Sequence, residues 1–230
     1  MTTSRKLNIK KYLLIFVMTI AAISYIFRFA INRAPAKAVG KIDNSFFHSG
    51  DIIFQSSKSE QAIAIRMATD SYYSHCGIIY NDSNQLYVYE AVQPVRLTPF
   101  NEWIARGEGG RFQVRRLKDA DKILTPATIL KMKAEGEKYL GKDDDNYFGW
   151  SDEQIYCSEL VWKIYKQATG LSIGELQPLV SLNLSVPLVQ EKLYERYGKN
   201  IPLNEKVITP LEIYKSPLLI TVYANGKPQL

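Results

Sequence analysis

The sequence predicts an α+β domain in which helices pack on an antiparallel sheet. Two strand-like runs, 76–80 and 85–89, flank a cluster of turn-forming residues, which predicts a β-hairpin. From Cys157 onward, apolar residues recur at the spacing of one helical face, which predicts a buried amphipathic helix. Residues 34–230 are sufficient for one hydrophobic core, and we expect one domain rather than two.

The net positive charge of the chain is confined to its first 33 residues. The formal charge is +6; residues 1–33 hold six of the 29 basic residues and no acid, which leaves 23 basic and 23 acidic residues in 34–230. The predicted domain is therefore formally neutral. The pI of about 9.1 gives no support for a nucleic-acid-binding face on it.

Residues 1–33 are predicted to direct the chain to a membrane. Four basic residues precede an uncharged run from Tyr12 to Phe27, and Arg28 follows. This pattern fits a cleaved signal peptide, with small residues at 34–36 as the cleavage site, and also an uncleaved anchor that extends to Ile31. Arginines are unusual before a cleavage site, so we favour the anchor. The basic residues predict a cytoplasmic N-terminus and a domain in the cell envelope, or in the periplasm if the segment is cleaved.

The remaining elements follow from periodicity, caps and turn residues. Thr125 followed by Pro126 is typical of a helix start, and Gly170 is typical of a helix end. The run Lys142 to Asp145 lacks the glycine and the closing glutamate of a calcium loop, and we interpret it as a solvated linker. The other predicted elements are a strand at 50–55, helices at 59–67 and 101–105, a strand at 112–117, a helix from 126 to before 141 and a strand at 218–223.

Cys157 lies at the start of the predicted buried helix, where Ser151 and Gln154 have the spacing of a capping box. Unpaired backbone N–H groups and the positive end of the helix dipole favour the thiolate form of a cysteine in this position. The position therefore suits a catalytic nucleophile. The alternative is that Cys157 is a small buried apolar residue.

His75 is the candidate partner of such a nucleophile. If Asp82 and Ser83 form a two-residue hairpin loop, His75 lies directly opposite Glu90, whose carboxylate can then orient the imidazole ring. Strand alternation places Cys76 on the opposite face, which argues against a disulfide with Cys157. The alternative is a surface histidine, as we expect for His48, which has no arranged partner.

Several motifs together resemble one family. They are GDIIF at 50–54, YSHCG at 73–77, YEAV at 89–92, WSDEQIYCSELVW at 150–162 and YGKNIPL at 197–203. From about Phe47 to Tyr223 the chain is similar to the YiiX/YebB-like family, the circularly permuted branch of the NlpC-type papain-like cysteine hydrolases. In ordinary papain-like enzymes the cysteine precedes the histidine, whereas here His75 comes first.

The resemblance implies a fold and a set of roles. The implied fold is permuted papain-like, with an antiparallel sheet or partial barrel, packed helices and, in this chain, a preceding N-terminal apolar helix. Cys157 would be the nucleophile, His75 the general base and acid, and Glu90 the orienting residue. The N–H of Cys157 would contribute to the oxyanion site, with Tyr156 lining it. Acyl transfer would proceed through a thioester and needs neither a metal nor an organic cofactor.

The sequence leaves two classes of substrate open. NlpC-type relatives cut cell-wall peptides, while the permuted branch includes members associated with lipids or acyl bonds. The neutral domain, the predicted membrane segment and the apolar run from Leu179 to Val189 slightly favour a lipid or acyl amide, although packed core would look the same. The alternative functions are a non-catalytic lipid- or peptide-binding envelope protein and an envelope scaffold. We expect a monomer that binds no nucleic acid.

Overall fold

The computed structural model describes residues 44–83, 85–145, 150 and 152–226. These residues belong to one unit that begins at Ile42. The predicted membrane segment, residues 1–33, lies outside the described residues. Within the described part of the chain, no helix is both long and apolar enough to cross a membrane.

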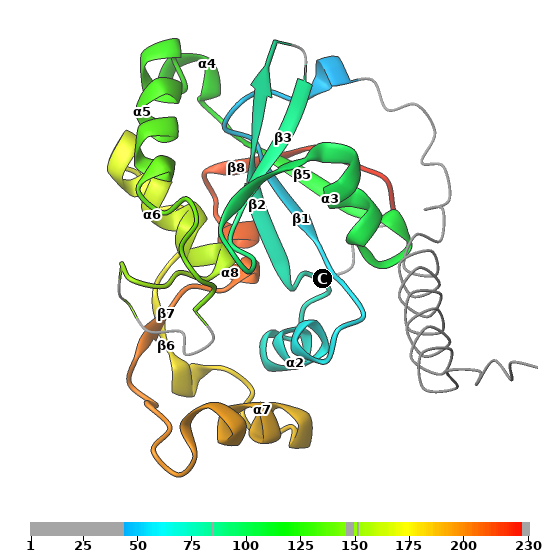
Figure 1. Ribbon diagram of the computed structural model, residues 1–230, viewed down its shortest axis with the longest axis vertical. Helices are drawn as coiled ribbons and strands as arrows, with labels where there is room; N and C mark the ends of the chain where they lie inside the picture. The colour runs from blue at the N-terminus through cyan, green and yellow to red at the C-terminus, as the bar shows by residue number, and fades with distance from the viewer. Residues whose placement is uncertain (1–43, 84, 146–149, 151, 227–230) are drawn as a thin grey trace, which may run out of the picture. The chain divides into compact units, whose positions relative to one another are not determined.

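A six-stranded antiparallel sheet forms the centre of the unit, with the strand order β4-β3-β2-β1-β5-β8 (Figure 1). A second sheet consists of two short strands, β6 and β7. The strands are β1 (Ile52–Gln55), β2 (His75–Asp82), β3 (Gln85–Glu90), β4 (Arg96–Pro99), β5 (Phe112–Leu117), β6 (Gln177–Pro178), β7 (Lys206–Val207) and β8 (Leu219–Ala224).

Helices connect and cover these strands. Three short 3₁₀ turns, η1 (Asn44–Phe46), η2 (Glu108–Gly110) and η3 (Leu179–Ser181), complete the described elements. The helices are α2 (Glu60–Thr69), α3 (Phe100–Arg106), α4 (Ala120–Ile123), α5 (Pro126–Glu137), α6 (Cys157–Thr169), α7 (Pro187–Tyr197) and α8 (Pro210–Lys215).

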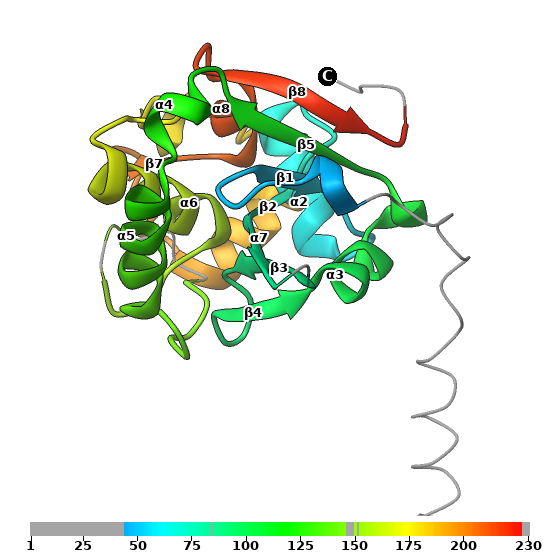
Figure 2. The same cartoon turned by 90° about the horizontal axis from the view of Figure 1, so that it is seen from above.

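Both faces of the sheet are buried, each in its own apolar cluster. Along β2, Cys76 and Ile78 belong to the cluster that contains the buried residues of α6, whereas Ile79 belongs to the cluster that contains Trp103 of α3. Figure 2 shows α5 and α6 on one side of the sheet and α3 on the other. The alternation of side chains along a strand therefore assigns successive residues of β2 to two different helical layers.

The predicted helix boundaries are largely confirmed. Thr125 accepts a hydrogen bond from the Thr128 N–H, and α5 begins at Pro126. Helix α6 ends at Gly170, which has a left-handed φ of 78°.

The predicted capping box at Ser151 and Gln154 is wrong. Helix α6 begins at Cys157, with Tyr156 as the N-cap residue. The carboxylate of Glu159 accepts the Tyr156 N–H at 3.5 Å, so a glutamate inside the helix supplies the cap. Ser151 itself lies outside the described residues.

The predicted hairpin is confirmed, but its register is wrong by two residues. Asp82 pairs with Gln85 and Ile78 with Tyr89, so paired positions sum to 167 instead of 165. Glu90 therefore lies beside Gly77 and diagonal to His75. A shift of two residues leaves Glu90 on the same face of the sheet, because side chains alternate with a period of two.

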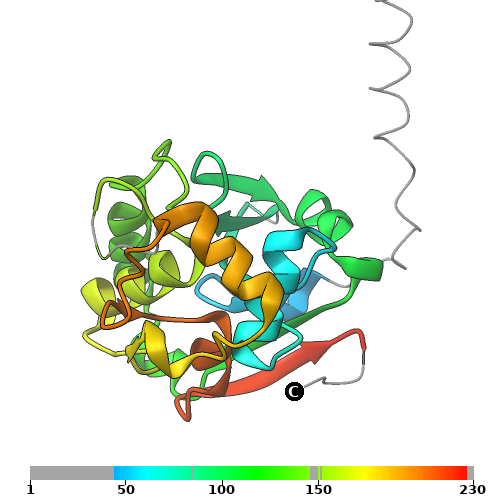
Figure 3. The same ribbon diagram turned by 90° about the horizontal axis from the view of Figure 1, so that it is seen from below.

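Helix α7 lies in the segment between residues 171 and 210, for which the sequence analysis predicted no helix. Figure 3 shows α7 crossing α2 at the lower end of the sheet. Val189 and Leu193, one helical turn apart, are buried with Ala64 of α2 in a third apolar cluster. Their spacing after Pro187 was the signal for this helix.

At Gly77, strands β2 and β3 approach each other so closely that a larger side chain would not fit. A Cβ atom at this position would lie 2.5 Å from Val88 Cγ1 and 2.7 Å from the Tyr89 carbonyl oxygen. We expect Gly77→Ala to lower the free energy of unfolding by about 1–3 kcal/mol through overpacking. Urea denaturation measures this change.

The matched control is Gly226→Ala, where the nearest atom would be the Arg111 Cδ at 3.4 Å. We expect this change to stay within about 0.5 kcal/mol of the wild type. Equal stability of the two variants would contradict the close approach at Gly77.

Candidate active site

His75 is the first residue of β2, at the end of the sheet that faces α2. Its ring stacks on Trp103, with 5.9 Å between the ring centroids and an interplanar angle of 25°. Gln55 of β1 pairs with His75 across the sheet. The ring is thus fixed by the strand on one side and by a fully buried tryptophan of α3 on the other.

Glu90 holds one nitrogen of this ring. Its Oε2 atom lies 2.6 Å from His75 Nε2, while Oε1 accepts hydrogen bonds from Thr98 Oγ1 at 2.5 Å and from Arg106. Glu90 is 0% exposed. Burial alone would raise its pKa, but the hydrogen bond and charge of His75, with the charge of Arg106, lower the pKa to about 2. The predicted contact between His75 and Glu90 is therefore present, although the two residues are diagonal neighbours.

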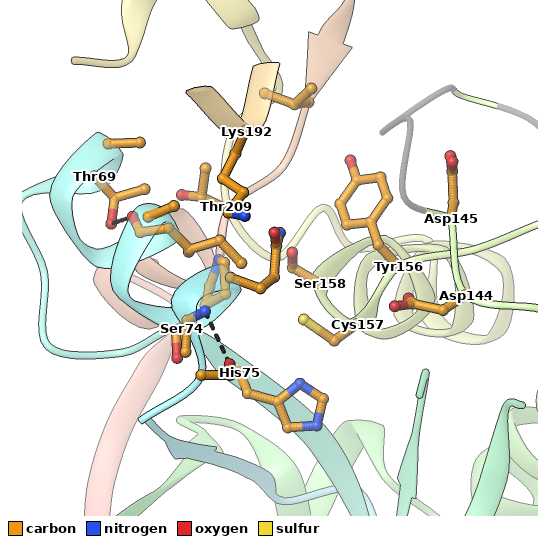
Figure 4. Close-up of a pocket in the computed structure, with 18 of the residues that line it drawn as sticks. Thr69, Ser74, His75, Asp144, Asp145, Tyr156, Cys157, Ser158, Lys192 and Thr209 are labelled. Atoms are coloured by element: carbon orange, nitrogen blue, oxygen red, sulfur yellow. Dashed lines mark hydrogen bonds between the residues drawn. The ribbon is translucent and has the colours of Figure 1, made fainter. Parts of the chain in front are cut away.

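Cys157 lies at the first position of α6, beside the His75 ring (Figure 4). A hydrogen bond from Cys76, opposed by burial and reinforced by the charge and hydrogen bond of His75, holds the pKa of Cys157 well below its ordinary value. Burial would lower the pKa of His75, yet the Cys157 and Glu90 charges raise it to about 10. Both shifts favour the pair of a thiolate and an imidazolium, an arrangement suited to nucleophilic attack.

The expectation that Cys76 and Cys157 point apart is wrong. Cys76 does belong to the face of β2 opposite the Trp103 cluster, but that face is the one α6 covers. Cys157 packs against the apolar cluster that contains Cys76. Side chains alternate along β2 as predicted, but the sequence did not show which face of the sheet α6 covers. Both cysteines are free thiols.

Tyr156, the N-cap residue of α6, lines the pocket described below. Its side chain is buried, and its hydroxyl accepts the Ile208 N–H at 3.1 Å. Figure 4 shows the ring pointing away from the Cys157 sulfur. The phenol therefore positions the start of α6 against residue 208, and an oxyanion role for it stays a prediction.

A pocket of about 340 Å³ opens onto Cys157 and His75. This volume is within the range of small-molecule sites. Figure 4 shows residues of α2 and of the chain around α7 on the side away from the sheet. Most of the wall is apolar and comes from α2, α7 and the segment before α7, with Ala64, Ala68, Leu179, Leu182, Val189 and Leu193.

Asp144 also lies beside Cys157 in the pocket (Figure 4). Burial, followed by the negative charge of Cys157, raises the pKa of Asp144 to about 6. Asp144 is partly exposed, whereas Asp145 is buried, at 4% exposed, and donates its N–H to the Ile155 carbonyl. The interpretation of this run as a solvated linker is therefore wrong for Asp145, and Asp144 lines the pocket.

Sequence reasoning missed several polar residues of the site. Thr98 and Arg106 bind Glu90 from β4 and from the end of α3, and Gln55 and Asp144 line the pocket. No local pattern marks these residues, since each acts through a tertiary contact. Within the described residues, no group of three or more His, Cys, Asp and Glu side chains is arranged to hold a metal ion.

The low pKa of Glu90 predicts how the stability of the fold depends on pH. Because its folded pKa of about 2 is below the ordinary 4.5, the carboxylate stabilises the fold fully above pH 4.5 and loses this effect as the pH falls toward 2. We expect Glu90→Gln to lower the free energy of unfolding by about 3 kcal/mol at pH 7. The difference from wild type should shrink between pH 4.5 and 2 in urea denaturation.

The control is Glu102→Gln on α3, an exposed residue that lies 3.7 Å from Arg96. We expect it to cost less than about 1 kcal/mol, because exposed ion pairs contribute little. A difference between Glu90→Gln and wild type that does not change with pH would contradict the assignment of the low pKa to Glu90.

Comparisons with known proteins agree with this geometry. The model of the permuted papain-like amidase enzyme family YaeF/YiiX, C92, matches residues 47–223. The uncharacterized protein YiiX of Escherichia coli (strain K12) is 48% identical over 174 residues, which cover 76% of this chain and 85% of that protein. The crystal structure of metalloprotein yiiX from Escherichia coli O157:H7 matches with a TM-score of 0.73 and 48% identity, and covers 77% of this chain and 97% of that one.

The family match extends over the sheet, α6 and the pocket, and it confirms the predicted α+β fold with a permuted papain-like topology. It also supports a cysteine hydrolase type of activity. The chain belongs to the YaeF/YiiX family of permuted papain-like amidases.

Proposed function

We propose that this protein is a cysteine hydrolase that cleaves an amide or ester bond through a thioester on Cys157. The observation that carries the proposal is that Cys157 lies in one pocket beside a His75 ring whose Nε2 atom is held by the buried Glu90 (Figure 4). A nucleophile, a base within hydrogen-bond reach and a third group that orients the base form the usual constellation for covalent acyl transfer.

Acylation begins from the thiolate, because the proton already rests on His75. The Cys157 sulfur attacks the carbonyl carbon, and the oxygen that becomes negatively charged faces the N–H of Cys157, which has no acceptor within the helix at this first position. As the tetrahedral intermediate collapses, the carbon–nitrogen or carbon–oxygen bond breaks. His75 gives its proton to the leaving amine or alcohol.

Deacylation reverses these roles. Neutral His75 takes a proton from a water molecule, which attacks the thioester carbonyl and releases the carboxylic acid and the thiolate. Glu90 stabilises the imidazolium in both steps and keeps the Nε2 atom engaged, so that Nδ1 is the atom left for proton transfer. Arg106 and Thr98 in turn hold Glu90 in place.

The pocket supports an acyl chain as the group next to the scissile bond. Its apolar wall extends from Cys157 toward α2 and α7, where a hydrocarbon chain would be removed from water at about 0.8 kcal/mol per methylene. The predicted membrane segment would hold such a site near lipids. A lipid ester or an N-acyl amine therefore fits better than a cell-wall peptide, which presents a polar backbone.

The Escherichia coli structure is described as that of a metalloprotein. The described residues of this chain offer no group of metal-binding side chains that matches such a site.

A series of fluorogenic acyl amides and acyl esters, with chains from acetyl to dodecanoyl, tests the proposal beside purified muropeptides. We expect kcat/KM to rise with chain length, and we expect Cys157→Ser to lower it by about a thousandfold or more. Binding of the long-chain amides by both proteins with no turnover by either would instead support a non-catalytic lipid-binding protein. Faster cleavage of muropeptides would overturn the choice of substrate.

Ala68 provides a direct test of where the acyl chain lies. It lines the pocket from α2 and is half-buried. We expect Ala68→Leu to raise KM for the dodecanoyl amide by about tenfold, because the added atoms displace about two methylenes of the substrate. The acetyl amide should be unaffected.

The control is Ala127→Leu, an exposed position on α5 outside the pocket. It should change neither KM. Equal effects of Ala68→Leu on short and long chains would contradict the proposed path of the chain.

A further inference from the structure

Backbone hydrogen bonds on both sides hold Asp144 beside the nucleophile. The Ile155 N–H donates to the Asp143 carbonyl at 3.2 Å, and the Asp145 N–H donates to the Ile155 carbonyl at 3.3 Å. Ile155 precedes Cys157, the first residue of α6, by two positions. This pair of hydrogen bonds therefore fixes Asp144 near the start of α6, where it lines the same pocket as Cys157 (Figure 4).

The carboxylate of Asp144 is available to a ligand. Its backbone N–H donates to the Gln93 side chain at 2.9 Å, but within the described residues no hydrogen bond or ion pair involves its carboxylate. Burial and the negative charge of Cys157 raise the pKa of Asp144 to about 6, while the charges of His75 and Arg196 act in the opposite direction. The carboxylate is thus ionised at neutral pH.

The basic side chains that line the pocket are, in contrast, already bound to other groups. Each has a partner in the described part of the chain: Arg106 donates to Glu90, Lys192 forms ion pairs with Glu60 and Glu195, and Arg196 donates to Gln61. An anionic ligand would compete with these partners. A cationic ligand can instead pair with Asp144 without breaking an existing contact.

Asp144 also lies away from the proposed path of the acyl chain. In the view of Figure 4, Thr69 of α2 and Asp144 lie on opposite sides of Cys157. The apolar wall that would receive the acyl chain comes from α2, α7 and the segment before α7. A substrate whose carbonyl carbon lies at Cys157 and whose acyl chain extends toward α2 then directs its amine or alcohol part toward Asp144.

We propose that Asp144 is a specificity-determining residue that binds a positively charged leaving group, so that the substrate is an acyl amide of a diamine or an acyl ester of an amino alcohol. This inference rests on the proposed hydrolysis and names its substrate class. The ammonium of such a leaving group would pair with a partly buried carboxylate, where water and salt screen the attraction less than at an exposed position.

Three octanoyl amides with leaving amines of similar size test the inference. The amines are ethylenediamine, propylamine and β-alanine, which place an ammonium, a methyl or a carboxylate group two carbons from the amide nitrogen. At about pH 7.5 the ammonium is charged, and so is Asp144, whose pKa is about 6. We expect kcat/KM to be about tenfold higher for the ethylenediamine amide than for the propylamine amide, and lowest for the β-alanine amide.

Asp144→Asn removes the charge and keeps the size of the side chain. We expect the ratio of kcat/KM between the ethylenediamine and propylamine amides to fall to about one, and Asp144→Lys to favour the β-alanine amide. The ratio compares two substrates of one protein, so a general effect on folding or on the nucleophile cancels. The control is Asp143→Asn, an exposed neighbour outside the pocket, which should keep the wild-type ratio.

Binding to Cys157→Ser, measured by calorimetry with and without Asp144→Asn, separates this inference from the hydrolysis. A preference for the ethylenediamine amide that Asp144→Asn abolishes, without turnover by the wild type, would contradict only the hydrolase. Equal wild-type turnover of the three amides would overturn the role of Asp144 alone, even if Asp144→Asn does not fold. A preference that persists in Asp144→Asn would also overturn it, and equal binding without turnover would contradict both.

Discussion

The site depends on one buried negative charge, the carboxylate of Glu90. Removing a carboxylate from water is costly unless it is paired and hydrogen-bonded, and Glu90 meets this requirement with His75, Thr98 and Arg106, which come from three different elements. The charge therefore ties β3 to the start of β2, to β4 and to the end of α3. His75 is one of the three partners of this carboxylate. The hydrogen bond that helps to stabilise the buried charge therefore also fixes the orientation of the His75 ring.

The thiol is placed by a separate part of the fold. Helix α6 packs on β2 with its N-terminus at the end of the sheet where His75 lies, and Tyr156 and Glu159 fix the first turn. Its positive end and the imidazolium then act on Cys157 together. The active groups are thus held by rigid elements, while α2 and α7 supply an apolar wall that determines which molecules reach them.

Local sequence patterns predicted the strands of the hairpin, the caps of α5 and the residues Cys157, His75 and Glu90, because each has a local signal. The contact of His75 with Glu90 survived an error of two residues in the register, since that error preserves the face of the sheet. The position of Cys76 beside Cys157 was missed, because it depends on which face α6 covers. Arg106 and Asp144 were missed for the same reason: their roles arise from tertiary contacts.

The central claim is that Cys157 is a thiolate paired with His75 at neutral pH. Its most direct test is the rate of Cys157 alkylation by iodoacetamide against pH, followed at the peptide level in wild type, His75→Ala and His48→Ala, the last being a change at the other, exposed histidine. The account predicts a midpoint well below the ordinary thiol value of about 8.5 in wild type and His48→Ala, and a midpoint near or above it in His75→Ala. Identical midpoints near the ordinary value in all three proteins would contradict it.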